Sequence, residues 1–354
     1  MSSVPQTTSE QQVTPVQRSE NVFMGHQDYI SVLLRLTGAE LYKLRRRPMS
    51  KVLSIIAICT VLLGLSLTGL QAFFANSAPA SAYLLPQCGS IADASQDCLN
   101  HAPTQADYQR AEAARQANLY TLSSPLRLPE SFLTSNQIIQ GLGLVLIIIL
   151  AGTIVGGEYG IGTIRVLYTR GPTRTQFLLA KALSLLTCTV VGVVVLSLAG
   201  VLMGALLSLI LGQPINFSFF TAEHMLHATA YLGITALGLL IYALIALFIS
   251  TLGKATAAGL AGALLWWGLE SILGGIFLLM GSVTKGILSS ILKAVPDYFI
   301  SNNINTLLNN QLHYLSGEEA GTGSDLHAIL VLLAYVIIFI GSACLINKRR
   351  DVTN

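Results

Sequence analysis

Six long apolar stretches dominate the pattern of hydrophobic and polar positions along the chain. A bilayer core of about 30 Å requires about 20 apolar residues, because a helix rises by about 1.5 Å per residue. The stretches are predicted at residues 52-74, 136-155, 180-211, 228-250, 255-281 and 328-346. The third is longer than one crossing requires, so it should tilt, bend near Gly200 or Gly204, or extend beyond the lipid. The pattern predicts an all-α membrane protein with six transmembrane helices.

The chain before the first span divides into two parts. Residues 1-27 are polar and lack an apolar signal-peptide core, so we expect a disordered cytoplasmic leader. Residues 28-47 place leucines and isoleucines at near-helical spacing with basic residues between them, which predicts an interfacial amphipathic helix. Its last residues are Arg45, Arg46 and Arg47. Three roles stay open for them: fixing the topology, contacting a cytoplasmic partner, or binding anionic lipids at about 1 kcal/mol per charge.

Composition and charge narrow the class and set the orientation. The 354 residues are 53% hydrophobic and only 10% charged, which excludes a soluble enzyme and a nucleic-acid binder. The net charge of +3 is too small to imply an anionic partner. With six spans both termini lie on one side, and 15 of the 20 Lys and Arg residues then flank the spans on that side. By the positive-inside rule, both termini are predicted to be cytoplasmic.

The first outer segment, residues 75-135, is long enough to carry structure of its own. Thr104 begins a capping-box pattern, and the Ala-rich and Gln-rich run that follows predicts a helix to about Tyr120. Cys88 and Cys98 lie in the same segment, where thiols can oxidise, and we expect a disulfide between them. The alternative is a metal site that also uses a nearby histidine, but it lacks a clear fourth ligand.

The second outer segment, residues 282-327, begins with an amphipathic stretch. Apolar residues from Val283 to Leu292 form one face, and Lys285 and Lys293 form another. Such a stretch lies on a membrane or re-enters it shallowly.

The inner loop at residues 156-179 is short, rich in glycine and cationic. Its glycines permit sharp turns as the chain leaves the bilayer, and Glu158 to Thr163 can form a brief helix parallel to the membrane. A carboxylate such as Glu158 can accept charge-assisted bonds from a docked soluble protein. The alternative is an ordinary cytoplasmic loop that obeys the positive-inside rule.

The loop resembles that of a known family, the permease subunits of type-2 ABC exporters. The matching positions are Gly157-Glu158, Gly162-Thr163, Pro172-Thr173-Arg174 and Lys181, together with Glu40 before the basic run. The sequence departs from the family at Tyr168 and Arg170-Gly171, which leaves the identity of the ATPase open.

The resemblance implies a type-2 exporter permease architecture in a bacterial cytoplasmic membrane. In such proteins the inner loop is a coupling helix that docks in a separate ATP-binding subunit, which binds ATP and Mg²⁺. The coupling residues carried over are Glu158, Gly162, Thr163 and Arg165. A second permease copy, identical or different, completes the transporter. The substrate stays open.

The chain lacks a phosphate-binding loop that ends in Gly-Lys-Ser/Thr. The nearest fragment, Leu252-Gly253-Lys254-Ala255, lacks the upstream glycine and the hydroxyl. We therefore expect no ATPase site, no catalytic residue and no cofactor in this chain.

Glu270 is the one acid within an apolar run, where a charge costs at least about 2.5 kcal/mol. It is either a substrate or proton site or a hydrogen-bonded structural residue. The first possibility gives the main competing function, a proton-coupled secondary transporter, although no internal repeat supports it. A membrane-embedded enzyme is disfavoured, because the His, Asp and Glu residues do not cluster at span ends. The pair His224 and His227 is at most a weak metal signal, and no metal is expected.

Overall fold

The computed structural model describes residues 29–84, 104–161, 173–214, 219–317, 321 and 323–349, and the elements in these ranges are helices. The predicted leader at residues 1-27 lies outside the described residues. So do Cys88 and Cys98, and their predicted disulfide stays a prediction.

Six helical stretches in the described ranges are long and apolar enough to cross a membrane, which confirms the predicted fold class. The second stretch is composite and includes a turn of π-helix. The stretches are α2 (Pro48–Ser77), α5 (Glu130–Ile138) continued by η4 (Ile139–Gly143) and α6 (Leu144–Ile161), α8 (Arg174–Ile210), α9 (Ala222–Gly253), α10 (Thr256–Val283) and α13 (Asp325–Arg349).

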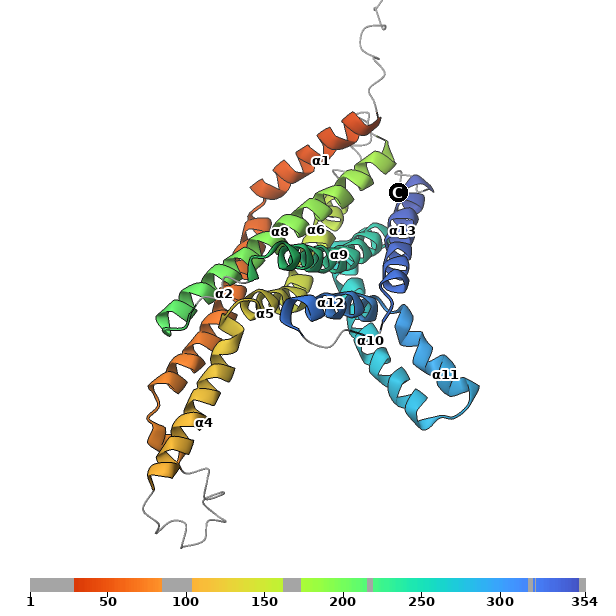
Figure 1. Ribbon diagram of the computed structural model, residues 1–354. Coiled ribbons are helices and arrows are strands. Elements are labelled where there is room, and N and C mark those ends of the chain that lie inside the picture. Colours follow the sequence, from red (N-terminus) through yellow and green to blue (C-terminus); the bar gives the residue numbers. More distant parts are fainter. Residues whose placement is uncertain are drawn as a thin grey trace, which may run out of the picture.

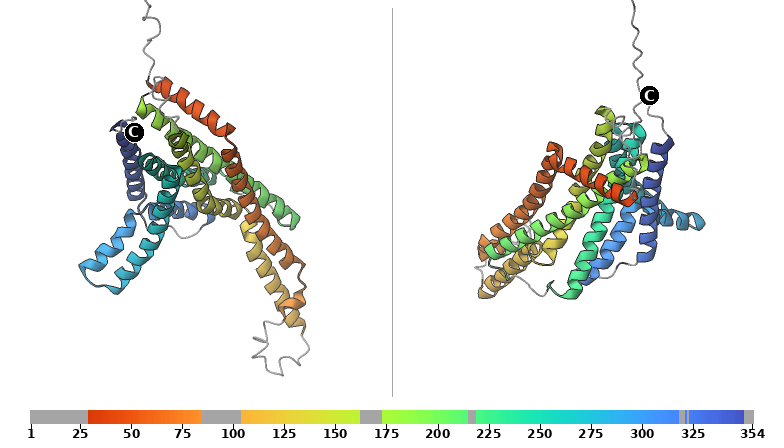
Figure 2. Two further views of the ribbon diagram at one scale, coloured as in Figure 1. Left: turned by 180° about the vertical axis from the view of Figure 1, so that it is seen from behind. Right: turned by 90° about the horizontal axis from the view of Figure 1, so that it is seen from above.

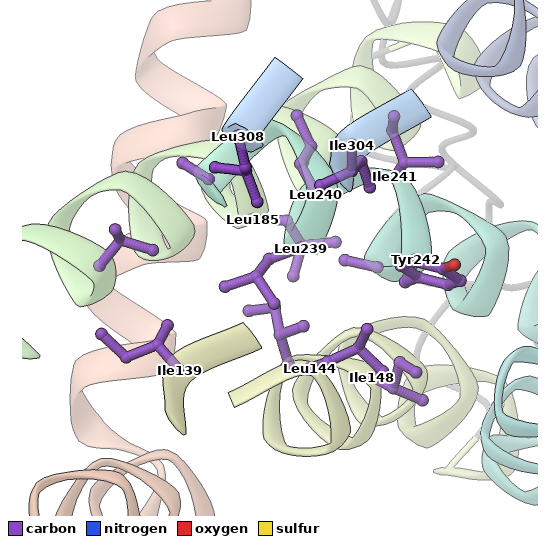
Figure 3. Packing of buried hydrophobic residues seen from close by; sticks show 14 of the residues in the cluster. Ile139, Leu144, Ile148, Leu185, Leu239, Leu240, Ile241, Tyr242, Ile304 and Leu308 are labelled. Atoms are coloured by element: carbon purple, nitrogen blue, oxygen red, sulfur yellow. The ribbon is translucent and has the colours of Figure 1, made fainter. Parts of the chain in front are cut away.

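The central helix is α9, the most buried of the six spans. It packs against α6, α8, α10 and α13, and these helices surround it in Figures 1 and 2. Figure 3 shows Leu239 and Tyr242 of α9 beside Leu144 and Ile148 of α6. The core of the molecule is therefore the apolar surface of one helix enclosed by its neighbours.

The long third span is a continuous α-helix of 37 residues, and its glycines serve close packing. A Cβ atom added at Gly200 would lie 1.9 Å from Ser135 Oγ, and one at Gly204 would lie 2.6 Å from Ser131 Cβ. Only glycine allows α5 to approach α8 so closely. At about 1.5 Å per residue, α8 is about 55 Å long and exceeds the bilayer core.

The first outer segment forms an arm beside the end of α2 (Figure 1). It contains η1 (Ala80–Tyr83), α4 (Gln105–Ser123) and η3 (Ser124–Leu126). Helix α4 begins with the predicted capping box of Thr104 and Asp107, which confirms that sequence signal. Arg115 Nη1 of α4 donates to the Asn76 carbonyl of α2 at 3.2 Å, and Asn118 Nδ2 donates to Tyr83 Oη at 2.9 Å.

The second outer segment contains more helix than the sequence indicated. Its amphipathic start is α11 (Ile287–Ala294), which folds back along α10 and has no buried residue. After η6 (Val295–Tyr298) comes α12 (Ile300–Ser316), which packs against α9 and α13. Figure 3 shows Ile304 and Leu308 of α12 at the central cluster. This segment therefore contributes to the core and is not only a surface hairpin.

Candidate functional site

The first helix, α1 (Tyr29–Arg46), lies along α8 at the end of the molecule where α13 also ends (Figure 1). Its apolar positions repeat with helical spacing, so one side faces the spans. Thr37, Glu40 and Leu44 are buried on that side, whereas Ile30 is exposed. Helix α1 thus brings a carboxylate against the half of the bundle in which α13 ends.

Two further charged residues approach Glu40 from the spans on either side of the predicted coupling loop. Glu158 lies in the last turn of α6, and Lys181 lies two turns into α8. Both are buried, with 5% of Glu158 and 0% of Lys181 exposed. Burying single charges at these positions would be costly unless they were paired.

Lys181 is the centre of this group. Its Nζ atom lies 2.8 Å from Glu158 Oε2 and 3.2 Å from Glu40 Oε2, and it donates to the Ile154 carbonyl at 3.2 Å. The ammonium also lies 4.6 Å from the ring centroid of Phe177, one turn earlier on α8. Lys181 therefore connects α8 to α1 through Glu40, and to α6 through Glu158 and the Ile154 carbonyl. The lysine itself is not exposed to solvent.

Two cations at the end of α1 complete what we call the ionic cluster: Glu40, Lys43, Arg47, Glu158 and Lys181. Lys43 Nζ lies 2.6 Å from Glu40 Oε1 and 3.8 Å from Glu158 Oε1. Arg47 Nη2 lies 3.8 Å from the same Glu158 oxygen. Three cations thus surround two carboxylates, and the excess positive charge lies on the half-exposed side of α1.

Burial and the neighbouring cations act in opposite directions on the pKa of Glu40. Burial alone raises the pKa of a carboxyl group, because the charged form loses its hydration. The positive charges of Lys181 and Lys43, with their hydrogen bonds, outweigh burial and hold the pKa of Glu40 below its ordinary value of 4.5. Glu40 is therefore ionised at neutral pH, as the ion pairs require.

The helices on both sides of residues 162–172 are anchored at this end of the molecule. At the far side, Thr173 Oγ1 accepts from the Gln176 amide at 3.3 Å, and Gln176 Oε1 accepts from the Thr173 amide at 3.0 Å. This capping box fixes where α8 begins. Asn347 Nδ2 of α13 then donates to the Arg174 carbonyl at 3.0 Å. The chain thus enters and leaves residues 162–172 from fixed points.

The end of α6 also packs directly on the turn between α9 and α10. A Cβ atom added at Gly156 would lie 2.3 Å from the Thr256 backbone nitrogen and 2.7 Å from the Ala255 carbonyl carbon. At the neighbouring Gly157 an added Cβ would meet nothing within 4 Å. The inner end of α6 therefore contacts α1, α8 and the α9–α10 turn at once.

The predicted coupling residues fall into two groups. Glu158 lies inside the ionic cluster, where it contacts Lys43, Arg47 and Lys181 of this chain. Gly162, Thr163 and Arg165 lie outside the described residues, and their coupling role stays a prediction. The sequence pattern included Glu40 and Lys181 but gave no sign that Lys181 would contact both Glu40 and Glu158. A lysine within an apolar helix was the available signal, because it demands a partner.

The basic residues at the end of α1 have different surroundings. Arg46 lies with its guanidinium carbon 5.0 Å from the Tyr42 ring centroid, and Arg47 belongs to the ionic cluster. Arg45 lines a groove between α1, α2, α6 and α8. These three residues therefore do not act as one basic patch.

Glu270 is a buried carboxylate with two hydrogen bonds inside the chain. Tyr242 Oη of α9 donates to its Oε2 atom at 2.9 Å, and the Ser301 amide donates to Oε1 at 3.1 Å. Ser301 is in the first turn of α12, whose N-cap residue Phe299 offers no side-chain acceptor. Glu270 therefore supplies the acceptor that the start of α12 requires. These contacts favour the structural interpretation of this residue.

His224 and His227 contact uncharged side chains. His227 Nδ1 lies 2.8 Å from Gln311 Oε1, and its ring stacks on Tyr314 with the centroids 3.9 Å apart. His224 Nδ1 lies 2.6 Å from Thr221 Oγ1. Across the described residues, His, Cys, Asp and Glu side chains form no group of three suited to a metal ion.

Comparison with known families gives a match across most of the chain. A family model described as an ABC-2 family transporter protein matches residues 34–352. The matched range contains Glu40, Glu158 and Lys181 and extends through all six candidate spans. A search of curated proteins found no match.

Proposed function

The chain belongs to the ABC-2 family of transporter proteins, and on this premise we propose that it is the transmembrane subunit of an ATP-driven exporter. Family membership makes it a multi-pass permease component of an ABC transporter and implies association with an ATP-binding subunit. The proposal adds three points. The partner hydrolyses the ATP, the substrate leaves the cytoplasm, and two permease copies form the pathway.

The orientation we propose places the ionic cluster in the cytoplasmic half of a bacterial cell membrane. The distribution of Lys and Arg supports it. The positions of α1 and of the end of α13 at one end of the molecule agree with an even number of spans (Figure 1). An ATP-binding subunit would then approach the molecule from that end.

The observation that carries the proposal is the position of Lys181 between Glu158 and Glu40. We expect the ATP-binding subunit to contact residues 162–172, which connect α6 to α8. A displacement of that segment would pull on Glu158, which lies in the last turn of α6 just before the segment. Because Lys181 holds Glu158 at 2.8 Å and Glu40 at 3.2 Å, α1 and α8 would move with α6. The three helices can thus act as one body in a switch between two states of the transporter.

In this mechanism Glu158 is a positioning residue, and the docking contacts belong to the segment that follows it. Its side chain is 6% exposed, which leaves little surface for a partner. Substitution of Glu158 should therefore affect coupling more than docking. Arg165→Glu should affect docking itself, because it reverses a charge within the expected contact segment.

The test is co-expression with the ATP-binding protein encoded beside the gene, followed by co-purification and ATPase and transport assays in lipid discs. We expect wild type to recover the ATPase, Arg165→Glu to lose it, and Glu158→Gln to retain it while losing transport-linked ATP hydrolysis. Glu112→Gln is the matched control, because Glu112 pairs with Arg115 at 2.7 Å on the outer arm, far from the cluster in sequence and fold. If no ATPase binds and transport follows a proton gradient that Glu270→Gln abolishes, the chain is a secondary transporter instead.

A further inference from the structure

A groove lies beside the elbow where α1 turns into α2, adjacent to the ionic cluster. It has a volume of about 730 Å³, within the range of small-molecule sites, and α2, α6 and α8 form most of its wall. Its deep part is lined by apolar residues such as Ile58, Leu146 and Leu196. Its upper part is lined by Arg45, Ser50 and Lys51 at the elbow itself.

The upper part of the groove carries positive charge that the described protein does not neutralise. Arg45 and Lys51 are exposed, and neither forms an ion pair with a described residue. The carboxylates of the adjacent ionic cluster, Glu40 and Glu158, are already held by Lys43 and Lys181. An anion at the elbow would therefore meet two available cations.

Backbone and hydroxyl donors converge on the same place. Helix α2 begins at Pro48, and its N-cap residue Arg47 provides no side-chain acceptor for the first amides. The first amides of a helix have no partner within the helix and favour anions. The Ser50 hydroxyl, also in this first turn, is buried without a hydrogen-bond partner in the described structure. Cations, amides and a hydroxyl thus form a set of donors suited to a phosphate group.

We propose that this groove binds an anionic phospholipid of the inner leaflet, with the phosphate at Arg45, Ser50 and Lys51 and an acyl chain along α2, α6 and α8. A bilayer fills any apolar groove on its protein boundary with lipid chains, so the selective feature is the headgroup site. A soluble anion would make no use of the apolar part of the groove. This inference goes beyond the proposed function, since it depends on α1 lying at the inner membrane surface and not on an ATPase.

The groove offers substitutions that separate its two parts. Arg45→Ala removes a lining cation, and Arg46→Ala is the matched control, because Arg46 is an exposed neighbour outside the groove. Gly192 lines the groove, and a Cβ added there meets nothing within 4 Å, so the side chain introduced by Gly192→Phe starts in open space and should occupy the apolar part of the groove.

The experiment is native mass spectrometry of the purified full chain, titrated with phosphatidylglycerol or with phosphatidylcholine of the same acyl chains. We expect tighter binding of phosphatidylglycerol to wild type. Arg45→Ala should weaken it about fivefold and Arg45→Ala/Lys51→Ala about 30-fold, as expected for about 1 kcal/mol per basic residue at a membrane surface. Arg46→Ala should leave the affinity unchanged, and Gly192→Phe should weaken both lipids.

Several results would overturn this inference. Equal affinity for the two lipids, or equal loss in Arg45→Ala and Arg46→Ala, would show that the elbow does not select a headgroup. Unchanged lipid binding in Gly192→Phe would show that no chain occupies the groove. A loss of dimer without a change in bound lipid in Gly192→Phe would assign the groove to a second copy of the chain.

Discussion

Replacing Lys181 by methionine is the sharpest test of the ionic cluster. Methionine has a similar length and suits an apolar helix, so the change removes the charge with little change in packing. It leaves Glu40 and Glu158, each 5% exposed, without their shared cation. Breaking a buried ion pair in this way costs about 3–5 kcal/mol, because the buried Glu158 is left with only the more distant cations Lys43 and Arg47, each 3.8 Å away.

A compensated variant distinguishes lost compensation from lost packing. In Glu40→Gln/Glu158→Gln/Lys181→Met, no uncompensated carboxylate is left beside the methionine. Replacement of a whole buried ionic group by uncharged residues is often neutral for stability. The triple variant should therefore recover most of the 3–5 kcal/mol expected to be lost by Lys181→Met, within about 1 kcal/mol of wild type.

Reversible unfolding in mixed micelles gives the free energies, with Glu112→Gln as the control for an exposed ion pair on α4. A cost below about 1 kcal/mol for Lys181→Met would be that of a surface salt bridge. It would refute the burial of the ion pairs of Lys181 with Glu40 and Glu158. A triple variant as unstable as the single one would show that Lys181 acts through packing on Phe177 and not through charge.

Three further predictions follow from single contacts. The lowered pKa of Glu40 contributes stability that is present above its unfolded value of 4.5 and is lost as the pH falls through the lower folded value. In unfolding experiments at different pH values, Glu40→Gln should therefore reduce the loss of stability at acid pH. An unchanged loss of stability at acid pH would contradict the assignment. Gly156→Ala places a Cβ 2.3 Å from the Thr256 nitrogen and should cost about 1–3 kcal/mol, whereas Gly157→Ala, in open space, should not destabilise. Glu270→Leu removes the acceptor at the start of α12 and should cost about 1 kcal/mol in the same unfolding assay. Transport should survive Glu270→Gln. Loss of transport in Glu270→Gln would favour a proton-coupled role.

The six spans and α1 were predictable because both depend on local pattern. A span requires only enough consecutive apolar residues, and α1 requires only apolar positions at helical spacing. The helix in the outer arm was predictable for a similar reason, since Thr104 and Asp107 form their capping box within one turn. These features use contacts between residues close in sequence.

Helix α12 was missed because its local pattern is ambiguous. Five asparagines lie between its apolar residues, and asparagine is a weak helix former. Ile304 and Leu308 do repeat at helical spacing, and both are buried. What stabilises the helix is tertiary: the apolar side packs on α9, and Glu270 caps its first turn from another span. Neither contact is visible in the sequence of the segment.

The ionic cluster could be predicted in part. Lys181 within an apolar run requires a compensating acid, and the chain has few acids at the predicted inner side, among them Glu40 and Glu158. The pairing itself joins residues 141 positions apart and depends on how α1 lies across α8. No local pattern fixes that angle, so the acids could be named as candidates but not assigned to Lys181.

Charge, more than apolar contact, fixes where α1 meets the spans. An apolar helix face can slide along another with little penalty, because neighbouring positions offer similar contacts. The bond of Lys181 to Glu40 has one position, and a shift of one turn would leave a buried ammonium and a buried carboxylate apart. The same register brings Lys43 and Arg47 to Glu158. Helix α1 therefore has a defined position relative to both ends of the segment at residues 162–172, which transmission of a displacement from that segment requires.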